Sequence, residues 1–286
     1  MPELQILING LVLGSLYACM AVGFSLVWGV LNVINMLHGS FIVLGAYIAF
    51  FLHRELGVHP FFSVPIAGTA LFALGYVLQR GAINRVVARP VLTTLTLTFG
   101  LDMLVYNVMI LAFSATPVRI ILDVGRIEAA GIVVPVDRIA AMMLALSLTA
   151  ILYAVMRGSQ MGRAIVAVRM DRDAAALMGI KVERIYAITF ALGAMMAGAA
   201  GCVLAMVFPI SPTISGQYLG KVFVVCVLGG LGNVPGALAG GFALGLIESF
   251  SGVYLGPQNA MMMGYLLMLL LLLVRPTGIV GRRGYE

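Results

Sequence analysis

Long apolar tracts dominate the chain and predict helices that cross a membrane. The first runs from Leu4 to His53 without a formal charge, which is enough for two spans at about 20 residues per crossing. The later tracts are Leu56 to Gln79, Pro90 to Val118, Ile139 to Met156, Ile185 to Gly220, Val222 to Ile247 and Ser249 to Val274. They are continuous rather than alternating, which excludes transmembrane strands.

This pattern predicts an all-α, polytopic transmembrane helical bundle. We expect eight or nine membrane-inserted helices, with interrupted or re-entrant segments among them, in a single domain over residues 1–286. Composition agrees, because 62% of the residues are hydrophobic and only 10% are charged, whereas a soluble domain has roughly 25% charged residues. The first tract follows no basic segment and is long, so we expect it to stay as a span rather than be cleaved.

The three cysteines and three histidines point to no chemistry. Each cysteine lies in an apolar tract, which favours a packed thiol over a disulfide or a metal ligand, and His38, His53 and His59 lack metal-ligand spacing. The nearest approach to a phosphate loop, SGQYLGKV, lacks the first glycine and the hydroxyl after the lysine. We therefore expect no cofactor, no metal and no enzymatic activity in this chain.

Basic residues are distributed unevenly between the loops, and this predicts the orientation in the membrane. Twelve lie in three sets, which are Arg80, Arg85 and Arg89; Arg157, Arg163, Arg169, Arg172, Lys181 and Arg184; and Arg275, Arg282 and Arg283. The opposite set has five, namely Arg54, Arg119, Arg126, Arg138 and Lys221. The positive-inside rule then places the carboxyl terminus in the cytoplasm and the amino terminus outside. The net charge of +6 reflects topology rather than nucleic-acid binding, so no nucleic acid is expected as a partner.

One polar stretch, Gly162 to Arg184, interrupts the apolar pattern with the sequence GRAIVAVRMDRDAAALMGIKVER. Acidic residues, an alanine run and a glycine predict a short helix between Asp171 and Gly179. Such a helix cannot cross a bilayer but can lie along its surface, with Leu177 and Met178 on one side. The loop from about residue 157 to 185 is therefore either a docking site for a soluble partner or an ordinary charged loop.

Two further stretches combine polar residues and glycines between apolar runs. They extend from Asn32 to Gly39 and from Gly229 to Gly236. Transporters interrupt helices near the membrane centre and expose backbone groups to the solute there. We therefore assign to a translocation path the residues Asn32, Asn35, His38, Gly39, Gly232 and Asn233. The alternative is that both stretches are turns with small-residue packing.

Ionisable and hydroxyl side chains within the tracts add candidates. Charges at membrane depth normally face protein or water, and Glu248 follows the second stretch, so it joins the predicted path. Thr94 and Thr98 either bond to the backbone and bend their helix, or line the path. Lys221 is expected near the outer boundary, where its side chain can reach water.

The polar stretch resembles a known sequence. GRAIVAVRMDRDAAALMGIKVERIY is similar to the cytoplasmic coupling loop of ABC importer permeases of the branched-chain amino acid (LivH) type. Two other segments agree, from Asn9 to Tyr47 and from Val227 to Ser249, although the family has an aromatic where Met36 or Leu37 stands. The resemblance assigns ATPase coupling to Gly162, Arg163, Arg169, Asp171, Arg172, Asp173, Ala175, Ala176, Leu177, Met178 and Gly179.

The resemblance implies a membrane-spanning subunit of a binding-protein-dependent importer for branched-chain or related small amino acids in the bacterial inner membrane. The implied partners are a second permease subunit of the LivM type, two cytosolic ATPase subunits, a periplasmic solute-binding protein and the lipid bilayer. Urea, amides or aromatic acids are alternative solutes. An ATPase-independent secondary transporter or channel is the alternative class, and a membrane-embedded enzyme or scaffold is a third.

Overall fold

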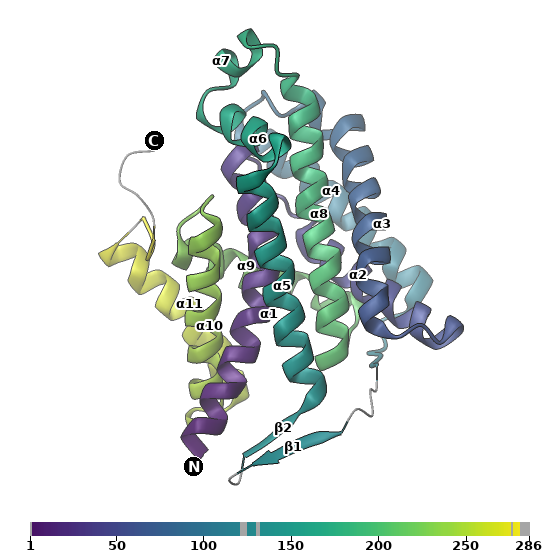
Figure 1. Cartoon of the computed structure of the whole chain (residues 1–286), viewed down its shortest axis with the longest axis vertical. Helices are drawn as coiled ribbons and strands as arrows, with labels where there is room; N and C mark the ends of the chain where they lie inside the picture. The colour runs from purple at the N-terminus through teal and green to yellow at the C-terminus, as the bar shows by residue number, and fades with distance from the viewer. Residues whose placement is uncertain (1, 121–124, 130–131, 276, 281–286) are drawn as a thin grey trace.

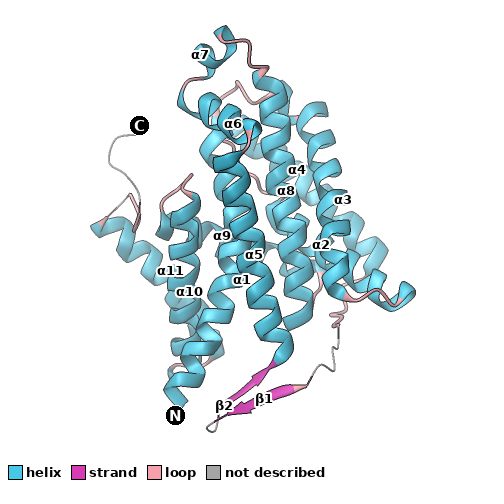
Figure 2. Cartoon of the chain, viewed as in Figure 1, coloured by secondary structure: helices cyan, strands magenta, loops and turns pink. Residues whose placement is uncertain are grey.

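The computed structural model describes residues 2–120, 125–129, 132–275 and 277–280, and it is a helical bundle with one small hairpin (Figures 1 and 2). The helices are α1 (Pro2–Leu31), α2 (His38–Leu56), α3 (Pro60–Gly81), η1 (Ile83–Arg85), α4 (Val91–Phe113), α5 (Val136–Gly158), α6 (Gln160–Met170), α7 (Arg172–Leu177), α8 (Val182–Val207), η2 (Pro212–Ile214), α9 (Ser215–Gly229), α10 (Val234–Tyr254) and α11 (Pro257–Val274). The antiparallel strands are β1 (Arg126–Ala129) and β2 (Ile132–Pro135).

Within the described residues, eight helices are long and apolar enough to span a membrane, and α9 is a ninth, shorter one. This confirms the predicted helical bundle. Figure 1 shows α7 at one end of the bundle and the β1–β2 hairpin at the other, and we call these the α7 end and the hairpin end. Two basic residues of the orientation argument, Arg282 and Arg283, lie outside the described residues, as does Asp123.

Helices α1 and α8 form the centre of the bundle. In each of them the protein buries 89% of the most apolar 18-residue stretch, against 11% of the corresponding stretch in α4 and α11. The reason is in the sequence of α8, where glycines and alanines allow close approach. A Cβ added to Gly45 of α2 would overlap the backbone of Gly198, and one added to Gly201 would overlap the Ile42 carbonyl. The small residues of α8 therefore pack inside this chain.

The first interrupted stretch is a non-helical segment that enters the bundle between α1 and α2. After α1 ends at Leu31, the chain turns back through Asn32, which has a φ of 53°. Helix α2 then begins at His38, whose Nε2–H donates to the carbonyl oxygen of Met20 at 2.8 Å. Met20 lies about 16 Å before the end of α1 at 1.5 Å per residue. Helix α2 therefore begins midway along the bundle.

The second interruption lies elsewhere than predicted. Gly230 and Gly232, with φ of 100° and 75°, form a tight turn between α9 and α10 at the α7 end, where Gly232 packs on Gly29 near the end of α1. The break is instead the segment between α8 and α9, residues 208–214. It returns the chain from the hairpin end to Ser215, whose carbonyl lies against Gly39 at the start of α2. The two broken elements therefore meet inside the bundle.

Candidate functional site

The loop over residues 157–185, which we call the coupling segment after the role that the resemblance implies, begins with a sharp turn from α5 into α6. The Oγ of Ser159 accepts a hydrogen bond from the Gly162 amide at 2.9 Å and so caps α6. A Cβ on Gly162 would overlap the Met156 carbonyl, so only glycine fits at this position. Gly162, to which the resemblance assigns a coupling role, thus sets the direction in which α6 leaves the membrane-spanning helix α5.

Helix α7 is short and well capped, and its tip is bare. One carboxylate oxygen of Asp171 accepts from the amides of Asp173 and Ala174, both at 2.9 Å, and Gly179 ends the turn with a φ of 84°. Leu177 and Met178 are 90% and 83% exposed. Large apolar side chains held this far out on a capped helix, beyond the ends of α3 and α4 (Figure 1), are a candidate docking surface.

The three arginines of the coupling segment have different surroundings. Arg163 lies close to the Gly158 carbonyl, at 3.5 Å, and Arg172 pairs with Asp173 at 3.4 Å with both side chains exposed. Arg169 instead reaches the turn between α9 and α10, because one of its Nη atoms lies 3.5 Å from where a Cβ of Gly232 would be. Arg169 therefore lies beside this turn, while Ala175 is the buried residue of α7 and Ala176 is exposed.

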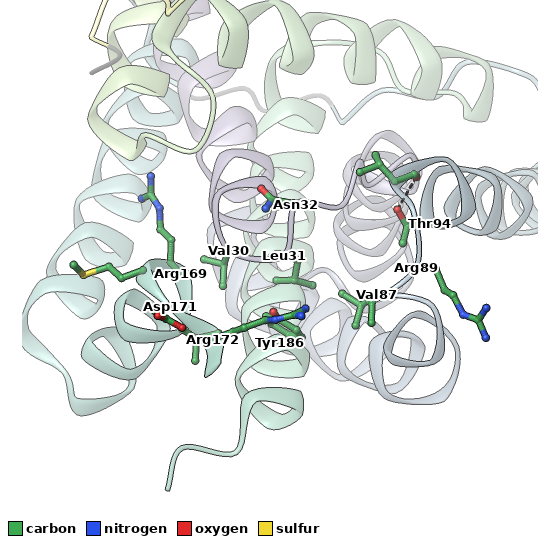
Figure 3. A pocket seen from close by; sticks show the side chains of 14 residues that line it. Val30, Leu31, Asn32, Val87, Arg89, Thr94, Arg169, Asp171, Arg172 and Tyr186 are labelled. Carbon is green, nitrogen blue, oxygen red and sulfur yellow. Dashed lines mark hydrogen bonds between the residues drawn. The ribbon is translucent and has the colours of Figure 1, made fainter. Parts of the chain in front are cut away.

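A pocket of about 400 Å³ separates the coupling segment from the ends of α1 and α4. Asn32 and Thr94 line it from the bundle, and Arg169, Asp171 and Arg172 line it from the coupling segment (Figure 3). The Oγ1 of Thr94 donates to the Val91 carbonyl at 2.8 Å, so its hydroxyl is taken up by its own helix. Two residues of the predicted path thus border the predicted coupling residues.

The first break gathers four other predicted path residues. Asn35 and His38 are fully buried, and both amide atoms of Asn35 and the Nδ1 of His38 find no hydrogen-bond partner among the described residues. Thr98 donates to the carbonyl of Ile34 at 2.8 Å and so ties α4 to the break. Gly39 is the contact with α9. Buried polar atoms without a partner are costly, so this break is a candidate functional site.

The last three predicted path residues lie away from this break. Gly232 and Asn233 belong to the turn at the α7 end, where the Nδ2 of Asn233 donates to the Val280 carbonyl at 3.3 Å. The carbonyls of Leu228 and Gly229, at the end of α9, accept from the amides of Ile279 and Val280. These hydrogen bonds satisfy the carbonyl groups at the end of α9, so this turn has a structural role.

Glu248 takes part in a buried charged cluster. Its Oε2 accepts from Lys221 Nζ at 2.9 Å and from the Tyr17 hydroxyl at 2.6 Å, and Lys221 also donates to that hydroxyl at 2.7 Å. The Lys221 side chain is 15% exposed. The prediction that Lys221 lies at the outer boundary is therefore wrong, because the residue lies in the middle of α9 rather than at the end of a span. At 15 residues α9 is too short to cross the membrane alone, so we call it a half-helix.

Sequence reasoning missed the break at residues 208–214 and the role of Tyr17. The signal for the break was present, since Pro209 and Pro212 interrupt the apolar tract and Ser211 and Thr213 bond to each other at 2.7 Å. Tyr17 carried no signal, because a tyrosine in an apolar tract is ordinary. Its pairing depends on the contact between α1 and α10, which no local pattern encodes.

Comparison with known families agrees with this architecture. The family described as the branched-chain amino acid transport system / permease component matches residues 6–274. The chain belongs to this permease family. As a permease component it is the transmembrane part of a multicomponent ABC transport system and carries no catalytic domain of its own. The permease is thus a multi-pass protein of an inner-membrane family.

Individual relatives cover the permease from end to end. It is similar to the high-affinity branched-chain amino acid transport system permease protein BraD of Pseudomonas aeruginosa, at 33% identity over 100% of this chain and 99% of the relative. LivH of Escherichia coli K12 is 34% identical over 99% of this chain and 97% of the relative. A probable LivH of Methanocaldococcus jannaschii is 27% identical over 98% and 93%. No solved structure matches the chain.

Proposed function

We propose that this permease imports branched-chain or related small amino acids, as one of two membrane subunits that two cytosolic ATPases drive. A second permease subunit of the LivM type completes the path, and a periplasmic binding protein delivers the solute. The names of the relatives, which are high-affinity branched-chain amino acid permeases, support the solute class. Urea, short amides and aromatic acids are the alternatives for the same architecture.

The observation that carries the proposal is the bare tip of α7. Leu177 and Met178 project from a capped helix at the end that the basic residues assign to the cytoplasm. Exposed ion pairs such as Arg172 with Asp173 contribute only about 0–1 kcal/mol, so the two apolar side chains carry most of the docking energy. A groove on the ATPase would bury them.

A chain of contacts connects the docking helix to the interior of the bundle. Arg169 of α6 lies beside Gly232 in the turn that follows the end of α9. The other end of α9, at Ser215, packs on Gly39 at the start of α2. Movement of α6 and α7 on nucleotide binding would shift α9 along its axis and so displace one broken element against the other.

The meeting point of the two breaks is where we place the solute path. Asn35 and His38 are polar and buried there without complete hydrogen bonding to protein, and backbone groups are not all held in helices. The charged groups near this meeting point are the Asp102 carboxylate, which accepts a hydrogen bond from Ser40 next to Gly39, and the mutually neutralising pair of Lys221 and Glu248. This environment suits a small zwitterion better than a multiply charged solute.

Substitution of Leu177 tests the docking role. We expect Leu177→Asp to abolish ATPase copurification and solute uptake in vesicles, because a carboxylate would replace an apolar anchor, while Leu177→Met should keep both. Asp171→Ala should weaken coupling, since losing an N-cap costs about 1 kcal/mol, whereas Asp171→Asn preserves the cap and should behave like the unmodified protein.

The outcomes separate the competing classes. If Leu177→Asp transports normally and the purified chain brings no nucleotide-binding subunit, the coupling role of α7 is wrong. If Asp171→Asn is as damaging as Asp171→Ala, the charge of Asp171 rather than its cap is required. Uptake assays with leucine, urea and an aromatic acid in the same vesicles distinguish the solutes.

A further inference from the structure

A second concave site at the α7 end lies apart from the coupling segment. Its volume is about 770 Å³, and it is formed between the end of α3, η1 and the start of α8. The polar side chains lining it are Tyr76, Arg80, Asn84, Arg85, Lys181, Glu183 and Arg184. The Asn84 amide donates to the Glu183 carbonyl at 3.4 Å and accepts from Gln79 at 2.9 Å, so η1 is tied to both helices.

The charge of this site is unbalanced. Arg80, Arg85, Lys181 and Arg184 face a single acid, Glu183. Among the described residues none of these four cations has a carboxylate oxygen within 4.0 Å, and Arg80 is only 3.5 Å from the Tyr76 hydroxyl. The pocket therefore attracts an anion, and its guanidinium groups match the oxygen atoms of a phosphate.

The outer face of α3 indicates which anion fits. Its exposed residues run at helical spacing from Phe62 and Ile66 through Thr69 and Ala73 to Val77, and the next position on the same face is Arg80. The Thr69 hydroxyl bonds back to the carbonyls of Pro65 and Ile66, so the strip is apolar along its length. An acyl chain lying on this strip would bring its head group to the pocket.

We propose that this pocket binds the phosphodiester head group of an anionic phospholipid. The strip on α3 holds an acyl chain, and Arg80 and Arg184 contact the phosphate from the two helices. The site is at the level where α3 ends, whereas α7 lies beyond it (Figure 1), so a lipid here and an ATPase on α7 bind at the same time. Basic pockets between spanning helices on the cytoplasmic side are suited to such head groups.

Native mass spectrometry of the tagged full chain, purified with its partner subunits and titrated with phosphatidylglycerol, tests the proposal. At about 1 kcal/mol for each basic residue near the head group, R80Q/R184Q should raise the apparent Kd for phosphatidylglycerol at least about tenfold. R80K/R184K should retain most of the binding, because the charge is kept. A matched control is R157Q/R275Q, which removes the same charge at the same end outside the pocket and should leave the Kd within about twofold.

The remaining arms identify the source of the phosphate and exclude unfolding. Inorganic phosphate at millimolar concentration should not displace the lipid, and phosphatidylcholine should bind equally to all variants. Equal phosphatidylglycerol binding by R80Q/R184Q and by the control overturns the proposal. So does an R80Q/R184Q protein that loses ATPase copurification but keeps its lipid, and so does displacement of the lipid by free phosphate. Gel filtration and thermal unfolding in the same detergent confirm that the variants are folded.

Discussion

At the scale of single residues, Lys221, Glu248 and Tyr17 show how ionised groups are accommodated inside an apolar bundle. They come from α9, α10 and α1, and three hydrogen bonds of 2.6–2.9 Å join them. The Nζ of Lys221 also lies 4.7 Å from the centre of the Tyr17 ring. Lys221 and Glu248 compensate each other's charge and the Tyr17 hydroxyl bonds to both, so the cluster holds three helices in one arrangement.

We expect Lys221→Met to lower the free energy of unfolding by about 3–5 kcal/mol, because it leaves the buried carboxylate of Glu248 without a compensating charge. The double variant K221M/E248Q should recover most of this loss, since no charge is then buried and the glutamine can still accept from Tyr17. Thermal unfolding of the purified protein in detergent measures both.

An exposed pair gives the control for this prediction. Arg54 and Glu55 are 3.0 Å apart, with side chains 62% and 58% exposed, so Glu55→Gln should change stability by only about 0–1 kcal/mol. A large effect of Glu55→Gln, or a double variant as unstable as K221M alone, would contradict the explanation by buried charge.

At the scale of elements, close helix contacts and two broken elements organise the interior. Gly201 of α8 leaves no space for a side chain, because a Cβ there would overlap the Ile42 carbonyl of α2. The same close approach positions the start of α2 against α9. The small residues of α8 thus hold α2 in place within this chain.

Gly201→Ala should destabilise the protein by about 1–3 kcal/mol, since the added methyl group forces α2 and α8 apart. Gly100→Ala on α4 is the matched control, because nothing lies within 4 Å of its Cβ position. That control should be neutral or stabilising by about 0.5–1 kcal/mol, as glycine is a poor helix former. Equal melting temperatures for the two variants would show that the α2–α8 contact is not tight.

At the scale of the whole molecule, the two ends of the bundle differ in charge and in shape. The α7 end carries helix α7 and the basic pocket, and the hairpin end carries β1, β2 and the loop after α4. We expect the α7 end in the cytoplasm. This orientation is a condition for both proposals, because ATPases and the basic-rich side of the membrane are there.

Labelling of introduced cysteines with a membrane-impermeant thiol reagent tests the orientation. The natural thiols, Cys19, Cys202 and Cys226, are all buried, so the unmodified protein should give little signal. Thr116→Cys at the hairpin end should react from outside in intact spheroplasts, and Ala176→Cys in α7 should react only after the membrane is opened. The reverse pattern would contradict the assigned topology and the ATPase-docking role of α7.

The features that follow from local sequence were predictable. Tracts such as Val91 to Phe113 are helical because they are apolar, long and free of interruptions, and Asp171 and Gly179 mark the ends of α7 by capping rules that involve only near neighbours. The first break was recognisable because polar residues and a glycine occur together between apolar runs. The coupling role of residues 162–179 came from the family resemblance and stays a prediction.

Features that depend on contacts between residues distant in the sequence were not predictable. Gly229 to Gly236 and residues 208–214 both interrupt apolar tracts, and only the packing of Ser215 against Gly39 shows which of them lies inside the bundle. A local pattern predicts that the chain turns but not how deep in the bundle the turn lies, because that depth is set by the helix against which the turn packs. The burial of Lys221 beside Glu248 has the same cause, since a charge is stable among helices only where the fold supplies its counterion.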